Sequence, residues 1–65
     1  MRTVMEKAFL NGLIKRLSLE NQAIIARKYN LDISSDKAFL NSLDNYPDSL
    51  NTLVNELLNE LLKEK

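Results

Sequence analysis

Apolar residues return every three or four positions along almost the whole chain, which is the period of an α-helix. Strand-like alternation is absent, and one Gly and one Pro leave few breaks. The pattern therefore predicts an all-α fold, a small bundle of about four short helices in a single domain over residues 1–65. The last helix is expected to be long and rich in Leu. The four expected helices cover about residues 3–17, 19–29, 35–44 and 47–63.

The two N-terminal segments each predict a helix with one apolar face. Ser18 is a good N-cap for the second helix, and Asn30 tolerates the left-handed backbone conformation that often ends a helix. Helical spacing then predicts which residues are buried. In the first helix these are Met5, Ala8, Phe9, Gly12, Leu13 and Leu17, and in the second Leu19, Ala23, Ile25, Ala26 and Tyr29.

Pro47 divides the C-terminal half into two further helices. Because proline cannot continue a helix but suits the first turn of one, it is expected to end the third segment and begin the fourth, with Asp48 in that first turn. The third helix is expected to start from a cap at Ser34 or Ser35. Its expected apolar face consists of Phe39, Leu40 and Leu43.

The apolar stripe of the fourth segment covers close to half of the helix circumference, enough to contact two neighbours. This width indicates self-association; the alternative is that the helix lies in the groove of its own three companions. A 65-residue chain without Cys or His has a small core and no disulfide or His-Cys metal site to support it, so association is the remaining aid. We therefore predict a homodimer, or a partner interface, formed by Leu50, Leu53, Val54, Leu57, Leu58, Leu61 and Leu62.

One seven-residue pattern occurs twice, as KAFLNGL at residues 7–13 and as KAFLNSL at residues 37–43. On a helix, each copy places Phe and Leu on one face beside a strip of small residues. The copies diverge outside these seven residues, so they indicate two wedges that pack the core, and no repeat architecture. Gly12 costs about 1 kcal/mol relative to Ala in a helix interior, which favours a close helix crossing there.

The formal net charge is zero, but the charges are unevenly distributed along the chain. Residues 1–30 carry six basic and two acidic side chains, a net charge of +4, and residues 31–65 carry three basic and seven acidic side chains, a net charge of −4. Either the halves neutralise each other within the fold or across a dimer, or one of them meets a partner of opposite charge. The candidate basic patch consists of Lys15, Arg16, Arg27 and Lys28.

The residue types that most enzymes use are missing. Without His and Cys the chain lacks the commonest general base, the thiol nucleophile and the usual transition-metal ligands. Glu56 and Glu60 share a helix face, but the Asn and Lys residues beside them indicate a solvated surface. Asp32, Ser34 and Asp36 lack the Gly and the closing Glu of a calcium loop. We therefore predict a non-enzymatic protein with no catalytic or metal-ligating residue and no cofactor.

Residues 22–31 resemble the first helix and turn of a helix-turn-helix DNA-binding unit. Ile25 and Ala26 match the pair that packs the first helix on the second, Asn30 the residue that ends that helix, and Leu31 the aliphatic residue that follows. The connection is about three residues longer than the tight turn of that family. The helix that would read the bases is also net acidic, although bases and phosphates are read by Arg, Lys, Asn and Gln.

Two functions remain after these exclusions. The first is a small helical regulatory protein that acts by protein–protein binding, to itself and to a protein target, in the manner of an inhibitor or antirepressor. The alternative is a DNA-binding transcriptional regulator with an atypical helix-turn-helix at about residues 22–43. No window holds the roughly 18 apolar residues that span a membrane, and no apolar signal-peptide region begins the chain, so the expected location is the cytoplasm without a membrane partner.

Overall fold

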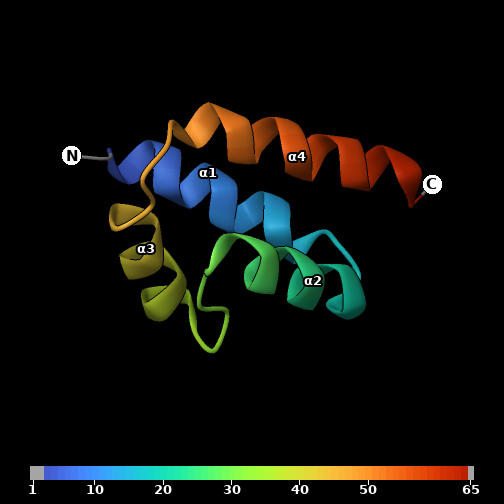
Figure 1. Ribbon diagram of the computed structural model, residues 1–65, viewed down its shortest axis with the longest axis horizontal. Helices are drawn as coiled ribbons and strands as arrows, with labels where there is room; N and C mark the ends of the chain where they lie inside the picture. The colour runs from blue at the N-terminus through green and yellow to red at the C-terminus, as the bar shows by residue number, and fades with distance from the viewer. Residues whose placement is uncertain (1–2, 65) are drawn as a thin grey trace.

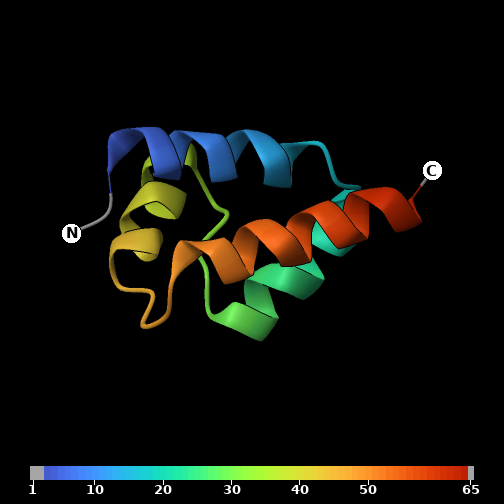
Figure 2. The same cartoon turned by 90° about the horizontal axis from the view of Figure 1, so that it is seen from above.

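The computed structural model describes residues 3–64 and shows a small all-α bundle, as predicted. Within these residues there are four helices and no strand: α1 (Val4–Lys15), α2 (Leu19–Tyr29), α3 (Asp36–Asp44) and α4 (Leu50–Lys63). Helices α1 and α4 run in the same direction, and α2 runs back below them (Figure 1). The short α3 lies at the end of the bundle where α1 and α4 begin, in both views (Figure 2).

Side-chain caps fix where the helices begin. The Thr3 hydroxyl accepts a hydrogen bond from the Glu6 backbone N–H at 3.1 Å, and the Glu6 carboxylate accepts one from the Thr3 N–H at 3.2 Å, which forms a capping box. Ser18 and Ser35 cap α2 and α3 in the predicted way. Helix α2 ends at Asn30, which has the expected left-handed conformation with φ 58°.

The beginning of α4 differs from the prediction. Ser49 is the N-cap, and its hydroxyl accepts a hydrogen bond from the Asn51 N–H at 3.2 Å, so Pro47 and Asp48 lie before the helix and not in its first turn. A helix that began at Pro47 would have the buried Tyr46 as its N-cap, which is not a capping residue, whereas the Ser49 hydroxyl satisfies an N–H group of the first turn. Tyr46 is buried just before this connection and joins the two helices by a hydrogen bond to Thr52 at 3.2 Å.

All four helices contribute to one apolar core. Its largest fully buried side chains are Leu10 of α1, Leu43 of α3 and Leu53 and Leu57 of α4. No polar or charged residue among those described is buried. The complete cluster consists of Leu10, Leu13, Ile14, Leu17, Ile25, Phe39, Leu43, Tyr46, Leu50, Leu53 and Leu57, with Tyr29, Leu31, Val54 and Leu61 packed against it.

The rotation of α1 about its axis differs from the prediction. Met5 and Phe9, expected in the core, are 83% and 55% exposed, whereas Leu10 and Ile14 are 0% and 2% exposed. Leu13 is buried, as predicted. The burial prediction is also wrong for four further residues that are exposed, Ala8 and Gly12 in α1 and Leu19 and Ala23 in α2.

Two overlapping apolar stripes on α1 explain this error, since both satisfy the helical period. Packing against α3 and α4 selects one of them, and with Leu10 and Ile14 in the core Lys7 and Lys15 also reach acidic side chains of α3. In α2, Asn21 is bound by α4, and Leu19 lies on the opposite side of the helix.

The two copies of the seven-residue pattern lie in different environments. Phe39 and Leu43 are buried, so the second copy is the predicted core wedge, but Phe9 of the first copy is exposed. A Cβ atom on Gly12 would meet nothing within 4 Å, so no helix of this chain crosses closely there. The expected reason for a glycine at this position is therefore wrong within the single chain.

The stability of the fold depends on the Leu cluster. We expect Leu53→Ala to lower the free energy of unfolding by about 2–5 kcal/mol, because it leaves a cavity at a site that is 1% exposed. Leu19→Ala is the matched control, since Leu19 is 81% exposed, and should change it by less than about 0.5 kcal/mol. Urea denaturation followed by circular dichroism measures both values. Equal losses in the two variants would contradict the assigned core.

Candidate interaction surface

Two ion pairs close the seam between α1 and α3. The Lys7 Nζ lies 3.0 Å from Asp44 Oδ1, and the Lys15 Nζ lies 2.6 Å from Asp36 Oδ1. The Lys15 ammonium is the largest cause of a lowered pKa of Asp36. Both lysines come from the basic half of the chain and both aspartates from the acidic half.

Polar contacts also close the seam between α2 and α4 near the C-terminal end of α2. The Tyr29 hydroxyl donates a hydrogen bond to Glu56 Oε1 at 3.1 Å, and the Lys28 Nζ lies 3.6 Å from Glu56 Oε2. The Glu56 carboxylate raises the pKa of Lys28. Desolvation first, and then the bond to Glu56, raise the pKa of Tyr29.

The Glu64 carboxylate closes the same seam at the other end of α2. It accepts hydrogen bonds from the Ser18 backbone N–H, with both oxygens at 3.1 Å, from the Ser18 hydroxyl at 3.3 Å and from the Asn21 amide. A carboxylate there also interacts favourably with the positive end of the α2 dipole. The hydrogen bonds, that from Asn21 first, lower the pKa of Glu64.

These contacts neutralise much of the charge asymmetry within the fold. Of the four ion pairs between described residues, three join the basic half to the acidic half, and the fourth joins Lys63 to Glu60 inside α4. The contacts also direct the candidate basic patch to different neighbours. Lys15 reaches α3 and Lys28 reaches α4, while Arg16 and Arg27 have no ion pair among the described residues.

The seam between α1 and α4 is apolar where it meets solvent. A hollow on α1 is lined by Ala8, Phe9, Gly12, Leu13 and Arg16, and a second hollow by Arg16, Leu58, Leu61, Leu62 and Glu64. Because Arg16 lines both hollows, they form one continuous surface. We call this surface the α1/α4 face and define it by Met5, Ala8, Phe9, Gly12 and Arg16 of the α1 segment and Leu58, Leu61 and Leu62 of α4.

The wide Leu stripe of α4 is divided between the core and this face. Leu50, Leu53 and Leu57 are 3%, 1% and 2% exposed and belong to the core. Val54 and Leu61 are partly buried and pack against the core, whereas Leu58 and Leu62 are 42% and 66% exposed. Three of the seven residues predicted as an interface are therefore buried inside the chain, and two are open to a partner.

The outer side of α4 beside this face carries a row of asparagines that ends in a lysine. Asn51, Asn55, Asn59 and Lys63 are exposed and follow one another at intervals of four residues, so they share one side of the helix. The acidic residues lie on another side, where Glu56 and Glu64 bind α2 and Glu60 pairs with Lys63. The acidic and apolar sides of α4 are therefore separated.

The α1 part of the face was missed by the sequence reasoning, which placed Met5, Ala8, Phe9 and Gly12 in the core. The available signal was the number of apolar residues in this helix. Adjacent apolar pairs, Phe9-Leu10 and Leu13-Ile14, make the apolar surface too broad for one buried stripe.

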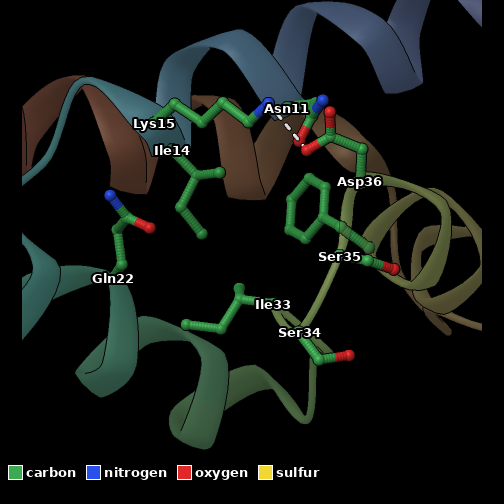
Figure 3. A pocket seen from close by; sticks show the side chains of 9 residues that line it. Asn11, Ile14, Lys15, Gln22, Ile33, Ser34, Ser35 and Asp36 are labelled. Carbon is green, nitrogen blue, oxygen red and sulfur yellow. Dashed lines mark ion pairs between the residues drawn. The ribbon is translucent and has the colours of Figure 1, made fainter.

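A smaller cavity lies between α1, α2 and the start of α3, with a volume of about 180 Å³. Ile14, Ile33 and Phe39 form its apolar lining, and the ion pair from Lys15 to Asp36 lies at its rim (Figure 3). Its other polar groups already have partners in the chain, for example the Gln22 amide that donates to the Leu17 carbonyl at 2.9 Å and Ser35, which caps α3. The cavity therefore lies where the α2–α3 connection packs against α1.

The described part of the chain has no cluster of metal-ligating side chains and no candidate membrane span. Among residues 3–64 no group of three or more His, Cys, Asp or Glu side chains is placed to hold a metal ion. None of the described helices combines the length and the apolar character needed to cross a membrane.

Comparison of the chain with models of protein families, with curated proteins and with solved structures finds no match.

The Glu64 contacts predict a dependence of stability on pH. A carboxyl group whose pKa is lower in the folded chain stabilises the fold above its unfolded pKa, and this contribution is lost as pH falls through the folded pKa. We therefore expect Glu64→Gln to destabilise the fold at pH 7, with a difference from wild type that shrinks between about pH 5 and pH 2. Urea denaturation at several pH values measures this.

Glu20→Gln is the control for this prediction. Glu20 lies in the first turn of α2, at the end of that helix which Glu64 contacts. Its side chain makes no hydrogen bond or ion pair within residues 3–64. Its substitution should therefore have the smaller effect at pH 7. If the two variants behave alike, the hydrogen bonds of Glu64 contribute nothing beyond the charge.

Proposed function

We propose that this chain is a small non-enzymatic regulatory protein that acts by binding protein through the α1/α4 face. The observation that carries the proposal is the exposure of Phe9, Leu58 and Leu62 along two adjoining hollows, with the exposed Met5 one turn before Phe9 on the same side of α1. Single exposed apolar residues are ordinary, but a cluster of large ones with a polar border is typical of a binding surface.

The composition of the face supports protein as the ligand. Aromatic residues, Met and Arg are enriched in protein interfaces, and Phe9, Met5 and Arg16 represent all three. Arg16 has a long apolar stem that can cover the hollow, with its charge at the rim. Arg is also among the residue types that carry most of the binding energy in protein interfaces.

The other two seams support the proposal by contrast. The α1–α3 and α2–α4 seams are closed by ion pairs and hydrogen bonds, which hold the four helices in a fixed arrangement. The α1/α4 face is therefore presented by helices rather than loops. A rigid surface loses less conformational entropy on binding than a flexible one.

The DNA-binding alternative has weaker support. The α2–α3 connection spans six residues from Asn30 to Ser35, and Asp36 and Asp44 lie at the two ends of α3, the helix that would enter the groove. The lysines that neutralise these aspartates come from α1 and are thereby held away from phosphates. No observation specifically favours this function.

The DNA alternative can be tested directly. We expect no binding of the purified chain to random duplex DNA at about 50 mM salt, where phosphate contacts are strong. Fluorescence anisotropy of a labelled duplex measures it. Binding that weakens steeply as salt rises would favour the DNA-binding function instead.

The proposed function predicts where partners contact the chain. A photo-crosslinking aromatic amino acid in place of Phe9 should form covalent adducts with protein in the cells from which the chain comes, since Phe9 is 55% exposed and lines the hollow on α1. The same amino acid in place of Lys37, which is exposed on α3, is the control. Gel mobility and mass spectrometry identify the adducts.

A further variant separates specific from random crosslinking. Adding Leu58→Asp and Leu62→Asp should remove the adducts from the Phe9 position, because a charge in an apolar interface is costly, while both residues are exposed enough to leave the fold intact. Circular dichroism verifies the fold. Adducts that are absent at Phe9, or equally abundant at Lys37, would contradict the proposed function.

A further inference from the structure

We propose that the partner on the α1/α4 face is a second copy of this chain. The two copies are related by a two-fold axis, and Leu58 and Leu62 of each pack into the hollow over Ala8 and Gly12 of the other. This inference rests on the proposed function, because it names the partner of the same face. Three features of the face support it: its shape, its charge and its size.

The shape of the face is self-complementary. The α1 side is hollowed at Gly12, where a Cβ atom would have nothing within 4 Å, and the exposed Phe9 stands beside it. The α4 side carries the projecting side chains of Leu58 and Leu62. In a two-fold interface, an element of one copy that contacts a second element of the other copy does so twice, so a ridge that fits a neighbouring hollow satisfies the contact on both sides of the axis.

The dimer explains why position 12 is a glycine, which the single chain does not. It has no positive φ, so its backbone does not require glycine, and its own chain leaves the space beside it open. A glycine in a helix interior nonetheless has a cost in stability relative to alanine. A residue larger than glycine at position 12 would exclude the side chain of the neighbouring copy from the hollow.

The charge of the face also suits a second copy. The chain carries nine basic and nine acidic residues, so two copies have no net repulsion. The row beside the face on α4 consists of Asn51, Asn55, Asn59 and the exposed Lys63. Arg16 and Glu64 both line the hollow on α4, and Glu64 is bound to α2. Because side chains of both signs lie at the face, its charge favours neither an acidic nor a basic partner.

The size of the molecule permits such an interface. A dimer contact at the low end of the usual range buries about 600 Å² on each partner. The accessible surface of this chain is 4566 Å², so this contact takes about one eighth of it. The face extends along α1 from Met5 to Arg16, about 16 Å of helix axis, and along α4 from Leu58 to Leu62, about 6 Å.

The first experiment measures self-association of the purified chain by sedimentation over about 10 μM to 1 mM, the range of weak interfaces. Wild type should approach twice the 7.5 kDa mass of the chain. Gly12→Leu should raise the dissociation constant by about tenfold to a hundredfold, because the added side chain fills the hollow. It should fold normally, since the monomer has open space at this position.

Ala23→Leu is the matched control for the substitution at Gly12. Ala23 is also exposed inside a helix, but it lies on α2, outside the face. Its dimerisation should equal that of wild type. A chain that remains monomeric throughout, or a Gly12→Leu variant that dimerises like wild type, would overturn the inference.

A second experiment tests the geometry of the dimer. Because the chain has no Cys, a Gly12→Cys chain can be mixed with a Leu62→Cys chain and oxidised without competing thiols. The mixed disulfide should form faster than in a mixture of Gly12→Cys with Lys37→Cys chains. Equal rates would overturn the two-fold arrangement.

The two proposals fail in different ways. A monomeric purified chain whose Phe9 position still forms adducts with other proteins in cells overturns the second copy as the partner and leaves the proposed function standing. A monomeric chain that forms no adducts overturns both proposals. A dimer whose adducts in cells are with itself supports both.

Discussion

The rotation of α1 about its axis is the constraint on which the rest of this structure depends. Helices α3 and α4 both pack against α1, so its orientation decides which side chains enter the core and which remain outside. Leu10 and Ile14 point into the cluster while Lys7 and Lys15 bind α3. The remaining sector of the helix is therefore turned to solvent, although it is apolar.

The polar contacts determine which of the helix seams is left open. Lys7 and Lys15 use their charges on α3, and Glu56 and Glu64 use theirs on α2. Each of these surface contacts contributes little energy by itself. Together they join the basic N-terminal half to the acidic C-terminal half and close the α1–α3 and α2–α4 seams. The Leu cluster holds the bundle together, and the seam between α1 and α4 is left with an apolar surface.

The elements that the sequence predicts well are those with local signals. Ser18, Ser35 and Asn30 act within one helical turn of themselves, and the helices they delimit agree with the structure. The start of α4 was placed too early because the prediction considered Pro47 and not the capping of Ser49. The rotation of α1 could not be predicted in the same way. Two apolar stripes fit its period equally well, and only contacts with residues far along the chain choose between them.

The α4 stripe shows why a face of this kind is hard to recognise in a sequence. Leu57 and Leu58 are adjacent and chemically identical, yet they are 2% and 42% exposed. A fourteen-residue helix that is apolar over half of its circumference exceeds what three short companions can cover. In a chain this small, adding core residues to one helix therefore also adds apolar surface. The stability of the single bundle and its exposed apolar surface consequently come from the same run of leucines, divided by the direction in which each side chain points.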